Sequence, residues 1–381
     1  MKKQFKLIAG CMALVMSLTA CSFNKETKEI GTPTPTAAVI DGGNNQGTDN
    51  DGGEVTPTAT PTPTPTPRVK QPGHYELNPY TVPLMMTELM GQKMTDAYIS
   101  FIDAVLKGET SFACADRDTY DWMMGQYAYV CCPVVDQYVC KSTNREPYEN
   151  GRGYFEYTIP YEEFKDKYEE FATYITEILN EVLEDDYSDF EKAFALYMYF
   201  ADNFSYDYDI YNLMYEQPVN DLVSGYLTLM EKKGVCGQLS VAYSYLLLQA
   251  GVDATVCSGC SDLSGEFHQW SYVRIEDVYY HIDPTFVLGS NMMSYFMMTD
   301  EGRYMEGHFP PESFVYVNNY YQWNPHEDYG CNDERFRPFW PACYEGIDCI
   351  NHELKYYEYI GAEPERTDFV YDYRKLFTGE E

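Results

Sequence analysis

The sequence predicts an α+β fold in which a helix that begins at a cysteine packs on an antiparallel sheet. Residues 234–240, GVCGQLS, lead into the run AYSYLLLQAGV, whose leucines and tyrosines recur at helical spacing until Gly251. Three short stretches with the pattern of β-strands follow, at 254–259, 267–275 and 278–286. Helical patterns also lie upstream of the cysteine, so both helices and strands are expected.

The first 20 residues predict a secretory signal peptide. Lysines open the chain, and the apolar run LIAGCMALVMSL that follows is shorter than a membrane-spanning helix needs. The ending LTAC resembles the lipobox of bacterial lipoproteins, in which the cysteine is lipidated and becomes the new N-terminus. The resemblance implies lipidation at Cys21 and a location on the extracellular face of the bacterial cell membrane. An ordinary cleaved signal peptide with an incidental cysteine is the alternative.

The rest of the chain divides into a predicted tether and a folded part. Residues 21–73 contain many Thr-Pro repeats and few large apolar residues, so they are predicted to be a disordered tether. We expect an N-terminal α+β extension at 74–185, a core at 186–300 and an aromatic- and Cys-rich C-terminal extension at 301–381. The formal charge of −34 disfavours nucleic acid as a partner.

Several further elements are expected upstream of the cysteine. They are helix 83–108, strands 127–140 and 152–160, a long amphipathic helix 161–183, and a helix from about 189 to 203 that Ser188 would cap. Beyond about residue 290 the sequence predicts no element.

The chain has twelve cysteines, of which ten remain after the signal peptide and Cys21 are set aside. Export permits disulfides, and spacing suggests three local groups. The groups are 114/131/132/140, 257/260 and 331/343/349. Zinc binding by Cys257 and Cys260 is an alternative, but no second ligand pair stands at the usual spacing. We expect no cofactor.

Cys236 differs from the other cysteines because it stands where a helix begins. Unpaired N–H groups and the helix dipole favour a thiolate there, and a thiolate is a nucleophile. Gly234 would allow a substrate backbone to approach, and the Cys236 N–H could hold an oxyanion. The structural alternative is a small buried residue that starts a core helix.

Two motifs follow Cys236 in order, HQW at 268–270 and HIDPT at 281–285. Together with GVC and the upstream stretch FSYDYD, they resemble the transglutaminase-like superfamily, whose core is papain-like. The resemblance covers roughly residues 186–290.

The resemblance assigns roles to individual residues. It implies that Cys236 is the nucleophile, that His268 is the base and that Asp283 orients the histidine. Trp270 would support the site by packing, and Tyr206 is a candidate second donor to the oxyanion.

Strand pairing gives an independent geometric expectation. If Glu276 and Asp277 form a two-residue turn, His268 and Asp283 become diagonal neighbours on one face of a hairpin, within reach of each other. A three-residue loop without a bulge would put them on opposite faces. His281 shares this face and is a rival base, although it lacks the H-x-W context.

These residues predict a cysteine enzyme that transfers an acyl group through a thioester. The favoured function is a peptidase or amidase acting on envelope proteins or wall peptides. A protein cross-linking transglutaminase and a non-catalytic surface binding module are the alternatives.

Overall fold

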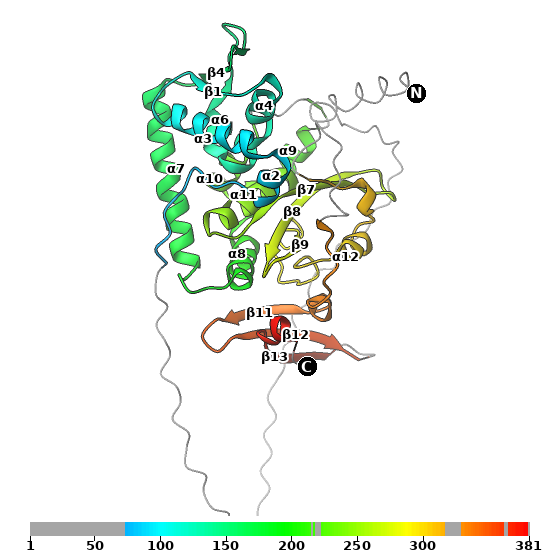
Figure 1. The fold of residues 1–381 in the computed structure, drawn as a ribbon. Helices are drawn as coiled ribbons and strands as arrows, with labels where there is room; N and C mark the ends of the chain where they lie inside the picture. The colour runs from blue at the N-terminus through cyan, green and yellow to red at the C-terminus, as the bar shows by residue number, and fades with distance from the viewer. Residues whose placement is uncertain (1–72, 215, 218–221, 317–328, 362–364, 380–381) are drawn as a thin grey trace, which may run out of the picture. The chain divides into compact units, whose positions relative to one another are not determined.

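The computed structural model describes residues 73–214, 216–217, 222–316, 329–361 and 365–379 (Figure 1). The predicted signal peptide 1–20, the lipidation site Cys21 and the tether up to residue 72 lie outside these residues. None of the described helices is both long and apolar enough to cross a membrane.

Helices and antiparallel sheets share the described chain, which confirms the α+β class. The helices are α2 (Leu84–Met90), α3 (Gln92–Leu106), α4 (Arg117–Trp122), the π-helix η1 (Met123–Tyr127), α5 (Ala128–Cys131), α6 (Pro133–Tyr138), α7 (Tyr161–Val182), α8 (Asp189–Asn203), α9 (Tyr208–Leu213), α10 (Gly225–Glu231), α11 (Cys236–Gln249), α12 (Asp300–Met305), the short 3₁₀ helices η2 (Pro311–Ser313) and η3 (Arg337–Phe339), and α14 (Lys375–Thr378). The strands form four groups: β1 (Ser111–Ala113), β2 (Val139–Lys141), β3 (Tyr148–Glu149) and β4 (Arg152–Tyr157); β5 (Ser205–Tyr206) with β6 (Lys233–Gly234); β7 (Ala254–Cys260), β8 (Phe267–Ile275), β9 (Val278–Ile282) and β10 (Val315–Tyr316); and β11 (Cys343–Asp348), β12 (Glu353–Ile360) and β13 (Glu365–Asp372).

The sheet that positions the candidate site has the strand order β10-β7-β8-β9, with every pair antiparallel. Its β8–β9 turn is the predicted one: Ile275 pairs with Val278, and both turn residues, Glu276 and Asp277, have positive φ. Such a turn suits the right-handed twist of the two strands. The predicted register of the hairpin is therefore confirmed.

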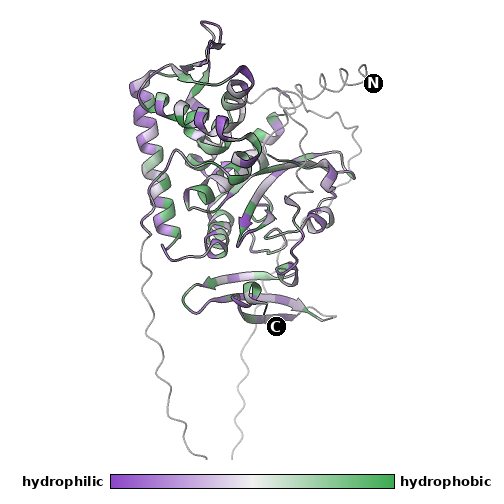
Figure 2. Ribbon diagram, viewed as in Figure 1, coloured by the Kyte–Doolittle hydropathy of each residue, from purple (hydrophilic) through white to green (hydrophobic). Residues whose placement is uncertain are grey.

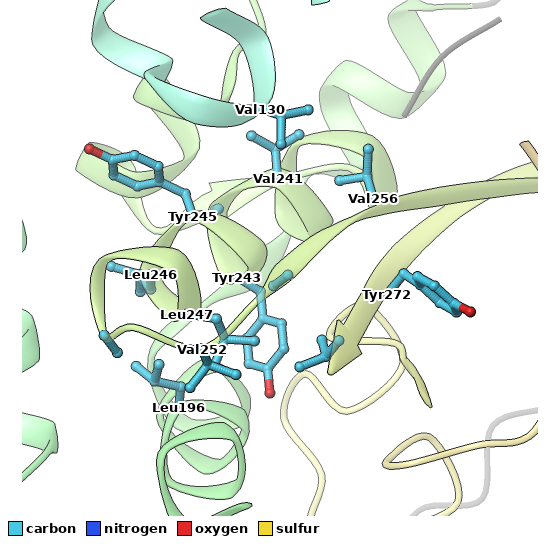
Figure 3. Close-up of a cluster of buried hydrophobic side chains, with 14 of the residues drawn as sticks. Val130, Leu196, Val241, Tyr243, Tyr245, Leu246, Leu247, Val252, Val256 and Tyr272 are labelled. Carbon is cyan, nitrogen blue, oxygen red and sulfur yellow. The ribbon is translucent and has the colours of Figure 1, made fainter. Parts of the chain in front are cut away.

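Helix α11 packs against β7 and β8 and is buried along most of its length. Its side chains Tyr243, Leu246 and Leu247 have no exposed surface. Figure 3 shows Tyr243 and Leu247 near Leu196 of α8, and Val130 of α5 beside Val241 of the same helix. A helix that is apolar on all sides needs cover on all sides, and this packing holds its first turn in place.

Helices α7 and α8 match their predicted ranges closely. The apolar stripe of α7 faces the core while its outer face is polar (Figure 2). Ser188 caps α8 through a capping box in which its side chain accepts from the Glu191 N–H and the Glu191 carboxylate accepts from the Ser188 N–H. The expected capping role of Ser188 is thus confirmed.

Three predictions about elements need correction. Residues 127–140 are mainly helical rather than a strand, and Pro133 stands at the start of α6, where a missing N–H costs nothing. The helix expected at 83–108 is interrupted by Gly91, whose φ of 72° breaks the helical path. Strand β9 ends at Ile282, two residues before Pro284, which cannot donate to a ladder.

The C-terminal segment forms a three-stranded antiparallel sheet with the order β11-β12-β13. It meets α8 through aromatic side chains: the rings of Phe190 and Tyr373 lie 5.2 Å apart. The Tyr373 hydroxyl also bonds to the Glu191 carboxylate. One continuous buried cluster runs from Met85 to Leu376, so the N-terminal, central and C-terminal segments share a core.

Candidate active site

Cys236 is the first residue of α11 and is partly exposed. The residue before the helix, Val235, has no side-chain acceptor and makes no capping hydrogen bond. The N–H groups of the first turn are therefore not satisfied by a cap and can face a negative charge at this end. The environment suits a thiolate.

His268 lies on β8, opposite Gly259 of β7. Its Nε2 is 2.7 Å from Oδ2 of Asp283, and its ring also interacts electrostatically with the Cys236 thiol. Because Nε2 bonds to Asp283, the other ring nitrogen, Nδ1, is the one that can interact with the Cys236 sulfur. Only about a tenth of the His268 side chain is exposed.

Asp283 follows β9 directly and has no exposed surface. Its Oδ1 accepts from the Thr285 N–H at 3.0 Å, and its own N–H donates to the Tyr295 carbonyl at 2.9 Å. Oδ2 contacts both His268 and the Arg303 Nη1, the latter at 3.2 Å. The carboxylate is thereby fixed in position on both of its oxygens.

The three groups shift one another's protonation. Burial raises the pKa of the Cys236 thiol, but the His268 charge and hydrogen bond, helped by the Gln269 N–H, outweigh burial and lower it. Burial lowers the pKa of His268, yet the charges of Asp283 and Cys236 raise it to about 9. These interactions favour a thiolate paired with an imidazolium over a neutral thiol and a neutral imidazole.

Asp283 remains charged despite its burial. Burial raises the pKa of its carboxyl, but His268 and Arg303 act against burial and the net shift is downward. Without such partners, a fully buried carboxyl would take up a proton instead of holding a charge.

Trp270, which the resemblance assigned a packing role, lies behind the histidine. It has no exposed surface, and its ring stacks near that of His268 with centroids 5.9 Å apart. Its Nε1 donates to Nδ1 of His281 at 2.8 Å. The indole therefore connects the face of His268 to a buried polar group.

His281, the alternative candidate for the base, uses both of its ring nitrogens in other hydrogen bonds. An indole N–H can only donate, so Nδ1 of His281 accepts from Trp270, and Nε2 carries the proton that goes to Asp300 at 2.8 Å. Both ring nitrogens are used, and the side chain has no exposed surface. These bonds leave His281 no free nitrogen with which to act as a base.

His281, Asp300 and Cys331 place three potential metal-ligating atoms close together. The same proton argument disfavours a metal there, because Nε2 would have to lose the proton that it donates to Asp300. Asp300 also accepts from the Cys331 N–H at 3.2 Å. The cluster is accounted for as a hydrogen-bonded link between β9, α12 and the segment at 331.

The Cys257–Cys260 zinc alternative conflicts with the geometry of β7. The two residues stand three apart on one strand, so their side chains point to opposite faces. The same geometry prevents a disulfide between them. Within the described chain, the cysteines of the other two groups, 114/131/132/140 and 331/343/349, are thiols, so these groups are not realised as disulfides either.

Gly234 and Tyr206 lie side by side in the parallel pair β5–β6, just before Cys236. A Cβ on Gly234 would come within 2.5 Å of the Thr228 hydroxyl. The sequence had suggested that Gly234 leaves room for a substrate backbone. In the structure, Thr228 of α10 fills that space. Tyr206 packs near Tyr208 and Tyr211, with ring centroids 5.0 and 5.9 Å away.

Sequence reasoning missed several residues that reach the site, most of them outside the motifs. Tyr129, on α5, places its hydroxyl 3.5 Å from the Gly237 carbonyl, and Gln269 donates to the same carbonyl at 3.2 Å. Phe286, which is 48% exposed, lies 5.1 Å from the His268 ring. Tyr129 and Arg303 stand in no pattern that spacing could have identified, whereas Gln269 lies inside the HQW motif and only its role was missed.

The central part of the chain is similar to a known family. Residues 176–284 match the model of the Transglutaminase-like superfamily. This transglutaminase-like region contains Cys236, His268 and Asp283, so the resemblance inferred from the motifs is confirmed. Tyr129 and Arg303 fall outside it, on opposite sides in the sequence.

Two solved structures are similar to part of this chain. One is a candidate cysteine protease from Cytophaga hutchinsonii, with 16% identity, a TM-score of 0.21, and coverage of 40% of this chain and 39% of that one. The other is a TGase, with 19% identity, a TM-score of 0.24, and coverage of 39% and 44%. The match therefore spans less than half of either protein. A search of curated proteins gives no significant match.

Proposed function

We propose that this chain is a cysteine acyl-transfer enzyme, a peptidase or amidase that works through a thioester on Cys236. One observation carries the proposal: Cys236 begins a helix and interacts electrostatically with His268, which in turn bonds to the buried Asp283 at 2.7 Å. Nucleophile, base and orienting group thus stand in sequence within the transglutaminase-like region.

In the first step, the Cys236 thiolate attacks the carbonyl carbon of the substrate. The Cys236 N–H, at the start of α11, is placed to donate to the developing oxyanion. The C–N bond then breaks, and the proton on His268 passes to the leaving amine. The products of this step are a free amine and a thioester, with His268 neutral.

In the second step, water attacks the thioester. Neutral His268 takes a proton from the water, the C–S bond breaks, and a carboxylic acid leaves. The thiolate–imidazolium pair is restored. An amine in place of water would give a cross-link by the same sequence of bonds, so the acceptor alone separates a hydrolase from a transglutaminase.

The substrate class that we propose is a peptide or protein of the cell envelope. Support comes from the predicted anchor at Cys21 and the predicted tether, which would keep the enzyme at the outer face of the membrane. The exposed ring of Phe286 beside His268 offers an apolar surface for a substrate side chain.

Incubation of the full chain with casein and a fluorescent primary amine tests the proposal. We expect cleavage or ammonia release without incorporation of the amine. Transfer to an amine needs a channel that admits the amine and excludes water, and the sequence shows no further motif that would mark such a channel. The matched control is Cys236→Ala, which should lose all activity.

The other outcomes select the alternatives. Cysteine-dependent incorporation of the amine would identify a cross-linking transglutaminase. If neither cleavage nor amine incorporation is detected with casein or with envelope peptides, and Cys236 is unreactive, a non-catalytic binding module would be favoured.

A further inference from the structure

We propose that Arg303 is a positioning residue of this active site, which neutralises Asp283 throughout the reaction and thereby sets the pH range over which Cys236 and His268 form an ion pair. The inference rests on the proposed function of the triad. It assigns a role to a residue outside the transglutaminase-like region.

The geometry places Arg303 directly on the acid of the triad. Its Nη1 lies 3.2 Å from Oδ2 of Asp283, the same oxygen that contacts His268. Neither Arg303 nor Asp283 has any exposed side-chain surface. Solvent therefore does not screen this ion pair as it screens the surface pairs of the chain.

The remainder of the guanidinium is held mainly by aromatic faces. Its central carbon lies 4.4 Å from the centroid of the Trp270 ring and 4.6 Å from that of Phe309. Within the described chain, Nε and Nη2 of Arg303 have no hydrogen-bond partner. A purely structural arginine would normally use these donors; here the ionic contact with Asp283 balances the burial of the charge.

The balance of charge explains why the site needs this cation. The titratable groups that face Arg303 and Asp283 are His268 of β8, Cys236 of α11, Cys257 of β7, Tyr197 of α8, Tyr295, and the exposed Glu306 at the end of α12. His268 and Arg303 are the cations of this set. With both present, the two buried anions Cys236 and Asp283 are matched by two cations.

The need for the Arg303 cation is greatest in the thioester intermediate. Once the His268 proton has left with the amine, Cys236 is uncharged as a thioester and His268 is neutral. Asp283 would then be a buried anion without a counter-ion, and would tend to take up a proton. Arg303 keeps the carboxylate charged, so that it can still hold His268 in the orientation that accepts a proton from water.

The test measures the alkylation rate of Cys236 by iodoacetamide between pH 4 and pH 10 in the full chain in detergent, with mass-spectrometric mapping of the label. The rate profile should show two inflections, one for thiolate formation and one for proton loss from His268. In Arg303→Met, both should move to higher pH by about one unit, because removal of a nearby cation disfavours the thiolate and favours the imidazolium.

Two further variants separate charge from shape. Arg303→Lys keeps the cation and should keep both inflections within a few tenths of a unit of the parent, even if the protein is less stable. Arg335→Met removes a comparable arginine that pairs with Asp333, away from the triad, and should leave the profile unchanged. Should Arg303→Met not fold, Arg303→Gln provides the neutral variant in its place.

The outcomes distinguish this inference from the proposed function. A folded neutral variant with unmoved inflections overturns the role of Arg303, provided that His268→Ala does alter the profile. If His268→Ala also leaves the profile unchanged, the triad itself is wrong. Equal shifts in the lysine and methionine variants would show that shape, not charge, matters.

Discussion

At the scale of single residues, the candidate site is an arrangement of four charges in a region with little solvent. Cys236 and Asp283 are the anions, and His268 and Arg303 are the cations. Each is stabilised by a neighbour of opposite sign, because burial alone would neutralise it. The protonation state of the thiol therefore depends on its charged neighbours as well as on its place at the start of a helix.

His268→Ala should slow alkylation of Cys236 at pH 6 by tenfold or more. Without the imidazolium, burial would raise the pKa of the thiol, and each pKa unit removes about nine tenths of the thiolate. In the parent chain the ion pair should persist from mildly acidic pH until His268 loses its proton near pH 9. Rates of iodoacetamide labelling over this range measure the effect.

His308→Ala is the matched control for that experiment, since His308 lies at the surface near Asp262. It should leave the labelling rate of Cys236 unchanged. In the parent chain, Cys236 should be labelled before any other cysteine at this pH, because burial raises the pKa of Cys257 and Cys331. Another cysteine labelled first would remove Cys236 from the role of nucleophile.

The sequence predicts some of these residues and not others for a physical reason. Cys236, His268 and Asp283 stand in short motifs on regular elements or directly after one, and the two-residue turn at Glu276-Asp277 decides which strand residues share a face. Arg303 and Tyr129 reach the site through tertiary packing of distant segments. No local pattern encodes such a contact, so their place could not be predicted from one sequence.

At the scale of elements, prediction succeeded where the local pattern agreed with the packing and failed where packing between elements decided the conformation. Helices α7 and α8 and the strands β7 and β8 carry clear patterns, and the structure matches them; β9 begins where expected but ends earlier. Residues 127–140 are rich in valine, tyrosine and cysteine, which favour strands, yet they pack as short helices against α10 and α11. Burial between other elements outweighed local preference.

Ser188→Ala should lower the free energy of unfolding by about 1 kcal/mol. The Ser188 hydroxyl accepts from the Glu191 N–H and closes the capping box of α8, the helix that packs against α11. Urea unfolding followed by circular dichroism measures the change. Ser188→Asn keeps an acceptor at the cap and should retain most of the stability; an equal loss in both variants would argue against the cap.

At the scale of the whole molecule, the site draws on segments that flank the transglutaminase-like region. Tyr129 comes from the N-terminal side and Arg303 from the C-terminal side, and the buried core is continuous across all three. A chain trimmed to 176–284 would lack both residues and would expose core surface. The flanking segments therefore contribute to the candidate site as well as to the core, and assays need the full chain.

The membrane location is the prediction that belongs to the complete chain. If the lipobox resemblance is correct, Cys21→Ala should move the protein from the membrane fraction to the medium or leave it unprocessed, since lipid at Cys21 is the proposed attachment. Metabolic labelling with a fatty-acid analogue should mark the parent chain and not the variant. Cys11→Ala is the matched control, because this cysteine lies inside the predicted signal peptide and would be removed with it. Label that persists in Cys21→Ala would show that the anchor is elsewhere, and the proposed envelope substrates would then lose their main support.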